Sequence, residues 1–169
     1  MPASLESTVQ DRVFDMVIGA DLFAADWSNC DRISNYVAGL VSQRRTDSLR
    51  YANLFSSVLN ELLETAFRCH RAPGEIACTV YRGTLHDRIE LSVPCDAASR
   101  AFYESAVAKA CLPDAADHFI SVMLDEQPFD PQISLLALAA DYQARITLDA
   151  SAGDQVTISV GFVIDEPAQ

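Results

Sequence analysis

Apolar residues recur at helical spacing along one long segment of the chain, residues 47–69. The apolar positions share one stripe of the expected helix and the polar positions share the opposite one. The apolar stripe consists of Tyr51, Phe55, Val58, Leu62 and Ala66, with Leu54, Leu59 and Leu63 beside them. The polar stripe consists of Asn53, Ser57, Asn60, Glu61, Glu64 and Arg68. The pattern predicts a core helix whose C-terminal half presents two carboxylates and an amide, which could serve a ligand site.

The rest of the chain divides into strand-like and helix-like patterns. Alternation with a period of two predicts strands over residues 12–20, 75–81, 88–93, 144–150 and 155–164. Helical spacing predicts further helices from residue 26 or 28 onward and over residues 97–111, 115–124 and 131–142. Two pairs of neighbouring strands form hairpins, and a positive φ is expected at Gly153 in the second. This order predicts a single α+β domain over residues 1–169, a two-layer sandwich of a mixed, mainly antiparallel sheet with helices on one face.

Composition and charge exclude several classes of function. The chain has 169 residues, half of them hydrophobic, and a formal net charge of −12. Nucleic acid is not expected as a partner, because phosphate binding needs a basic face. No segment reaches the length of an apolar membrane span, and residues 1–11 lack the pattern of a signal peptide. The five cysteines show no Cys-x-x-Cys spacing, so we expect free, mostly buried thiols and a cytoplasmic protein.

Two short motifs resemble those of a known superfamily. They are Asn-Glu-Leu-Leu-Glu-Thr-Ala-Phe-Arg at residues 60–68 and Leu-Leu-Ala-Leu-Ala-Ala-Asp-Tyr-Gln-Ala at residues 135–144. Together with the order of elements, they resemble the histidine-kinase-type (GHKL) ATPases over residues 11–164. The chain looks most similar to anti-sigma-factor-like and SiaB-type regulators of bacterial signalling. The resemblance implies an ATPase-like fold, a role in signal transduction and a site for ATP and magnesium.

The resemblance places the family's functional positions on particular residues of this chain. Glu61 falls where the family has its catalytic glutamate, with Asn60 beside it. Thr65 falls at the magnesium-binding position, where the family has asparagine. Asp96 could stand in for the aspartate that reads adenine, and Leu135 follows the second glycine-rich box. The glycines of both boxes are missing, because the corresponding segments read Pro-Cys-Asp-Ala-Ala-Ser (residues 94–99) and Asp-Pro-Gln-Ile-Ser (residues 130–134).

The missing glycines weaken the expected nucleotide site. Glycine lets the backbone approach phosphate closely and adopt positive φ, and Pro131 also lacks the N–H that would bind an oxygen. We therefore expect weak or absent ATP binding and a regulator that acts by protein–protein contact. By resemblance, its partner would be a STAS-like or SiaC-like protein or a response regulator.

Three alternatives remain open from the sequence. The first is an active serine/threonine protein kinase that phosphorylates such a partner, with Glu61 as the base. The second is a homodimeric scaffold that pairs through the helices of residues 28–43 and 48–68. The third concerns Glu61 and Glu64, which are either the remnant of a site or part of a solvated helix face.

Overall fold

The computed structural model describes residues 10–125 and 130–163. The described strands are β1 (Asp11–Gly19), β2 (Glu75–Arg82), β3 (His86–Pro94), β4 (Arg145–Asp149) and β5 (Gln155–Val163). The described helices are α1 (Ala20–Ala24), α2 (Ser28–Val41), α3 (Ser48–Cys69), α4 (Ala97–Ala110), α5 (Ala115–Leu124) and α6 (Ile133–Asp141). The protein is therefore of the α+β class, as the sequence predicts.

The described strands form one antiparallel sheet in the order β1-β2-β3-β5-β4. Strands β2 and β3 form one hairpin, and β4 and β5 form the other. Strand β5 lies between β3 and β4, so the two hairpins join side by side. Every pairing among the described strands is antiparallel, which narrows the predicted mixed sheet to a purely antiparallel one.

The core lies between one face of this sheet and the helices. In β3 the inward positions carry Ile89, Leu91 and Val93, all of them buried, and β5 alternates in the same way. The long helix α3 crosses this face and presents its apolar stripe to the strands. Phe55 of α3 meets Phe162 of β5 edge to face, with ring centroids 6.1 Å apart. Period-two strands and a period-3.6 helix thus share one apolar layer.

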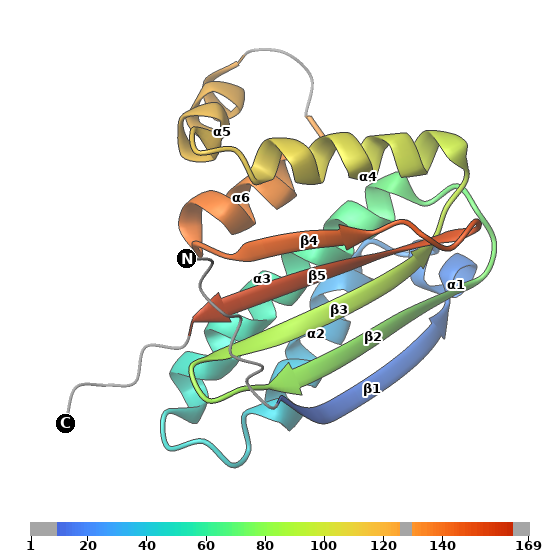
Figure 1. Cartoon of the computed structure of the whole chain (residues 1–169). Helices are drawn as coiled ribbons and strands as arrows, with labels where there is room; N and C mark the ends of the chain where they lie inside the picture. The colour runs from blue at the N-terminus through green and yellow to red at the C-terminus, as the bar shows by residue number, and fades with distance from the viewer. Residues whose placement is uncertain (1–9, 126–129, 164–169) are drawn as a thin grey trace, which may run out of the picture.

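Helix α3 is the centre of the helical layer (Figure 1). Helix α2 packs along one side of α3 and α6 along the other, while α4 lies against α6 and β4. Helix α5 packs mainly on α6 and is the outermost helix at the top of Figure 1. The helical layer therefore covers the inner face of the sheet and continues past its β4 edge.

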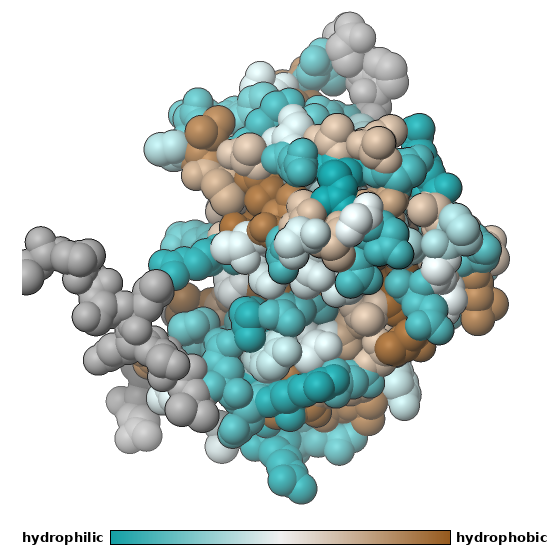
Figure 2. Space-filling view, turned by 45° about the vertical axis from the view of Figure 1, so that its right-hand side comes forward, coloured by the Kyte–Doolittle hydropathy of each residue, from teal (hydrophilic) through white to brown (hydrophobic). Residues whose placement is uncertain are grey.

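The opposite face of the sheet is polar. Ser92 and Thr157 share a hydrogen bond of 2.7 Å across β3 and β5, and the Thr79 hydroxyl donates to Asp15 at 3.0 Å. The Arg88 guanidinium lies over the Tyr81 ring, 4.2 Å from its centroid. In Figure 2 this face is mostly teal and white. A polar outer face explains why the strands alternate so regularly in sequence.

The predicted elements agree with the structure except at a few places. Helix α1 follows β1 directly and was not predicted, and β3 begins at His86 rather than at Arg88. The prediction of a positive φ at Gly153 is wrong. Among the glycines that the structure describes, that conformation belongs to Gly74, with a φ of 139°, just after the end of α3.

Candidate functional site

The C-terminal half of the polar stripe of α3 is a partly buried network, whereas Asn53 and Ser57 at its start are exposed. Asn60 Nδ2 donates to Glu64 Oε1 at 2.8 Å, and Arg68 Nη2 pairs with Glu64 Oε2 at 3.2 Å. Arg68 Nη1 also donates to the hydroxyl of Ser134 on α6, at 3.2 Å. These contacts link successive turns of α3 to each other and to α6. Both carboxylates are therefore partly buried instead of lying on a fully solvated helix face, and their origin as the remnant of a site stays a prediction.

Glu61 lies where α3 meets α6. Burial raises the pKa of its carboxyl, while a hydrogen bond with Ser134 opposes that shift. The nearby negative charge of Glu64 raises the pKa further, and the positive charge of Arg68 lowers it. Leu135, the next residue after Ser134, is fully buried in the core. The structure thus brings Glu61 and the start of α6 together, with Leu135 serving as a packing residue.

Thr65 and Asp96 are engaged in backbone contacts. Thr65 is fully buried, and its hydroxyl donates to the carbonyl oxygen of Glu61 at 2.9 Å, one turn earlier in the same helix. Asp96 caps α4 by accepting a 2.7 Å hydrogen bond from the N–H of Ser99, which lowers the pKa of its carboxyl. Both oxygens thus satisfy local backbone groups, as Thr within a helix and Asp at an N-cap commonly do.

Asp96 also lies apart from Glu61. The Ser99 hydroxyl donates to the carbonyl oxygen of Cys69 at 3.2 Å, which places the start of α4 beside the end of α3. Glu61 precedes Cys69 by eight positions, or roughly 12 Å along the helix axis. Asp96, the proposed adenine-reading residue, therefore lies near the C-terminal end of α3, whereas Glu61, the proposed catalytic residue, lies earlier in that helix.

The start of α2 closes the polar stripe from the other side. The Trp27 ring meets Phe67 edge to face at 4.9 Å, and the guanidinium of Arg68 lies 4.8 Å from the Trp27 centroid. Cys30 is buried close to Glu64 and Arg68, and burial is the main reason that its pKa rises to about 12. An aromatic ring and a neutral thiol thus cover part of the charged stripe.

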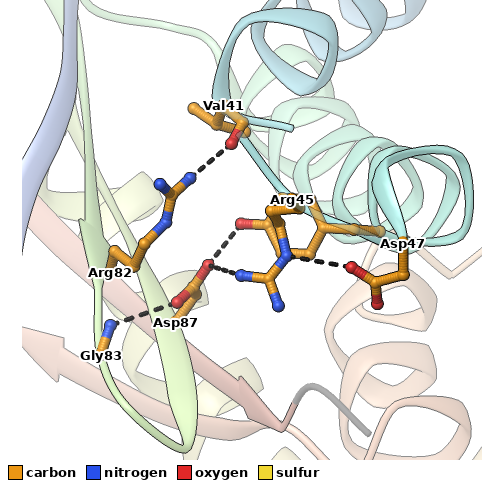
Figure 3. Close-up of polar contacts among 7 residues, drawn as sticks. Val41, Arg45, Asp47, Arg82, Gly83 and Asp87 are labelled. Atoms are coloured by element: carbon orange, nitrogen blue, oxygen red, sulfur yellow. Dashed lines mark hydrogen bonds and ion pairs between the residues drawn. The ribbon is translucent and has the colours of Figure 1, made fainter. Parts of the chain in front are cut away.

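A second polar cluster centres on Asp87, which is completely buried (Figure 3). The Tyr51 hydroxyl donates a hydrogen bond to Asp87 Oδ2, and the N–H of Gly83 donates to Oδ1 at 3.2 Å. Arg45 Nη1 lies 3.9 Å from the same carboxylate, and its guanidinium lies over the Tyr51 ring, 4.1 Å from the centroid. One buried charge thus receives two donors and a cation, as a desolvated carboxylate requires.

This Asp87 cluster joins two distant connections of the chain. Arg45 pairs with Asp47 at 3.4 Å in the segment between α2 and α3, and Arg82 of β2 donates to the carbonyl oxygen of Val41 at the end of α2. The β2–β3 turn is thereby fastened to the α2–α3 connection. Sequence reasoning missed the cluster because it began the strand at Arg88. Extending the period-two pattern backward places Asp87 in register with the inward-facing apolar residues.

A pocket of about 410 Å³ opens beside this cluster, where α3, the end of α6 and the end of β5 meet. Its lining residues carry both signs of charge and two aromatic rings: Asp47, Arg50, Tyr51, Leu54, Asp141, Tyr142, Gln143 and Val163. Gln143 has a left-handed φ of 49°, an uncommon conformation for a residue with a side chain. Asp47 and Tyr51 belong both to the pocket wall and to the Asp87 cluster, so the cluster fixes that wall.

Comparisons with known proteins give no relative for this chain. No protein-family model, curated protein or solved structure matches it. Within residues 10–125 and 130–163, no three His, Cys, Asp or Glu side chains gather as a metal site would require, and no helix is long and apolar enough to cross a membrane. All five cysteines lie in the described part; Cys111 is exposed, and the other four are buried free thiols as predicted.

Proposed function

We propose that this protein is a bacterial signalling regulator of the anti-sigma-factor-like, SiaB-type class within the GHKL superfamily, and that it acts by binding another protein. One observation carries the proposal. The residues at the superfamily's nucleotide-site positions serve internal packing: the Thr65 hydroxyl bonds to its own helix and Asp96 caps α4. Because these side chains support the fold instead of facing a ligand, we infer a binding role rather than a catalytic one.

The chemistry of the missing glycines supports the same proposal. Side chains now occupy both segments where backbone N–H groups would approach phosphate. The N–H of Gln132 already donates to Asp130 at 2.9 Å, so this donor is engaged within the second segment. ATP with magnesium would therefore bind weakly or not at all.

The proposed partner is a STAS-like or SiaC-like regulator or a response regulator, rather than nucleic acid or membrane. The net charge of −12 favours a partner with a basic surface. A homodimer through α2 and α3 is a further possibility for the same protein, since Tyr36 and Leu40 are exposed on the outer face of α2.

Two experiments test the proposal together. Calorimetric titration with ATP, with and without magnesium, should give no binding at millimolar nucleotide. Affinity purification from the source cells, under conditions that preserve weak complexes, should recover a STAS-like, SiaC-like or response-regulator protein. Micromolar, magnesium-dependent binding of ATP would refute the degenerate site, and recovery of metabolic enzymes alone would refute the regulatory role.

The second candidate function is a serine/threonine protein kinase, and the environment of Glu61 favours it. A half-buried carboxyl with a raised pKa, facing another helix, has the character of a general base. Glu61→Gln should then abolish phosphate transfer to the partner while leaving complex formation intact. Glu104→Gln, on the exposed surface of α4, is the matched control. Equal transfer by both variants would remove Glu61 from the mechanism.

A further inference from the structure

Helix α5 is unusually apolar for a helix at the surface. Its ten residues read Ala-Ala-Asp-His-Phe-Ile-Ser-Val-Met-Leu, and among them Ala115 alone is classed as buried. Ile120, Met123 and Leu124 are 55, 59 and 78% exposed. A helix that is apolar around most of its circumference is usually enclosed by protein. In this structure α5 packs mainly on α6, and much of its apolar surface faces outward.

The inward and outward apolar positions of α5 form two separate stripes. Ala115, Phe119 and Val122 follow helical spacing, are buried or half-buried, and form the stripe that packs inward. Ala116, Ile120, Met123 and Leu124 form the outward stripe, with Asp117, His118 and Ser121 completing the circumference. Packing on α6 therefore accounts for the first stripe and leaves the second unexplained.

A groove adjoins the outward stripe. It has a volume of about 590 Å³ and lies between the α4–α5 turn, α6 and the start of β4. Its wall is built mostly of small or apolar side chains, namely Ala110, Cys111, Leu112, Pro113, Ala115, Ala116, Ala139, Ala140, Gln143, Ala144, Arg145 and Ile146. Ala116 belongs to both the groove and the outward stripe, so the two are continuous. In Figure 2 brown and tan surface gathers in this upper part of the molecule. Small side chains allow another backbone to approach closely, as in grooves that accept helices.

The charged side chains that the structure places on α5 and just before it, Asp114 and Asp117, are acidic, whereas the far side of the groove carries Arg145. Between Lys109 and Arg145 the sequence contains no lysine or arginine and six acidic residues: Asp114, Asp117, Asp125, Glu126, Asp130 and Asp141. Asp114 and Asp117 lie in the first turn of α5 or just before it and are exposed. An apolar stripe with acidic neighbours is complementary to a helix that carries apolar residues on one face and lysine or arginine beside them.

We propose that the outward face of α5 and the adjoining groove bind a basic amphipathic helix of a partner protein. This inference rests on the proposed protein-binding function and names the surface that performs it. The binding helix would place apolar side chains on Ile120, Met123 and Leu124, and its cations near Asp114 and Asp117. A second copy of this chain would bring the same acidic cluster into contact with an equally acidic molecule, and an anionic membrane would repel the cluster.

The test uses the full-length protein and a fluorescent helical peptide of leucine and lysine, with a leucine and glutamate peptide of the same pattern as its control. Fluorescence anisotropy should show binding of the lysine peptide only. The variant I120Q/M123Q/L124Q should weaken that binding by roughly tenfold or more, because buried apolar anchors dominate such interfaces. L22Q/L49Q replaces two leucines that are 68 and 75% exposed at other places, on α1 and α3, and should leave affinity unchanged. Circular dichroism of every variant confirms that it is folded.

A second pair of variants tests the electrostatic contribution to peptide binding. D114N/D117N should lower the affinity and flatten its dependence on salt, whereas D11N/E75Q, at the β1 edge of the sheet, should do neither. Equal loss of binding in the α5 variants and their controls would overturn the proposal. So would a wild-type dimer in light scattering that I120Q/M123Q/L124Q converts to a monomer, since a second copy would then occupy the surface. Binding to anionic vesicles that the same triple variant abolishes would also overturn it.

The inference and the proposed function can fail separately. If purification recovers no regulatory protein but the lysine peptide still binds in an α5-dependent way, the regulatory role is wrong and the docking surface stands. If a regulatory partner is recovered and I120Q/M123Q/L124Q binds it as well as the wild type does, the docking surface is wrong and the regulatory role stands.

Discussion

The buried contact between Tyr51 and Asp87 gives the sharpest prediction for stability. Replacing Tyr51 with phenylalanine removes one hydroxyl and leaves the ring, so the packing against Phe55 and Arg45 is retained. The Asp87 carboxylate, completely buried, would then keep the Gly83 N–H and the Arg45 cation as partners. The change therefore isolates one hydrogen bond to a buried charge.

The expected cost follows from the charge on the acceptor. A hydrogen bond to a charged group contributes about 1.5–3 kcal/mol, more than a bond between neutral groups. No water reaches Asp87 to replace the lost donor, because the side chain has no exposed surface. Tyr51→Phe should therefore lower the free energy of unfolding by about 2 kcal/mol. Asp87→Ala should cost more, about 3–5 kcal/mol, because it removes the acceptor of both the buried Tyr51 hydroxyl and the Gly83 N–H and one of the two carboxylates beside Arg45.

Urea unfolding followed by circular dichroism measures both changes. Tyr36→Phe is the matched control, because the Tyr36 side chain is 65% exposed on α2 and should contribute almost nothing. The slope of free energy against urea should stay constant, so that a shift in midpoint reports stability alone. The double variant Tyr51→Phe/Asp87→Asn should cost less than the sum of its parts, because the two side chains share one interaction. The reasoning is refuted if Tyr51→Phe costs no more than Tyr36→Phe.

Four further predictions concern Gly83, Gly39, Glu61 and Cys111. Gly83→Ala should destabilise the protein by about 2–3 kcal/mol, because a Cβ there would lie 2.3 Å from the backbone oxygen of His86. Gly39→Ala, in the last turn of α2 with open space around it, should stabilise the protein by about 0.5–1 kcal/mol in the same urea assay. A loss of stability in both variants would contradict the geometry. Glu61→Gln should be more stable than the wild type at neutral pH and lose that advantage in acid. Because the pKa of the Glu61 carboxyl is raised in the folded state, this group stabilises the wild type fully at pH values below its pKa in the unfolded chain. That stabilisation is lost as the pH rises through the pKa of the folded state. Thermal unfolding of both proteins from about pH 4 to about pH 8 should therefore show the crossover in their relative stability. A disulfide-forming thiol reagent should label the exposed Cys111 first, because burial raises the pKa of Cys30 and Cys78 to about 12. Simultaneous labelling of the cysteines in the native protein would show that the core opens readily.

Much of the fold was predictable from local patterns. The long helix α3 and the paired strands on either side of α4 to α6 follow from periodicity, because each element buries one face. Helix α1 escaped prediction because it has only five residues, Ala20–Ala24, and begins directly after Gly19, the last residue of β1. The expectation at Gly153 failed because that hairpin loop turns without a left-handed glycine.

The candidate site was predictable only in part. The spacing of Asn60, Glu61 and Glu64 correctly placed them on one stripe, and the structure joins that stripe to α6 through Ser134. Sequence spacing could not show that the Thr65 hydroxyl turns back to its own helix. Whether the stripe binds ATP, and whether the protein acts by binding a signalling partner, stay predictions.

The sequence by itself determined the α+β class, the antiparallel hairpins and the apolar layer, because periodicity and turn residues act over short distances. Only the tertiary structure decided which polar residues meet. Asp87 and Tyr51 are 36 positions apart, and Arg68 and Ser134 are 66 apart. Contacts of that range depend on how whole elements pack, and no local pattern encodes them. The same packing leaves the outward face of α5 exposed, although its residues read like a core helix.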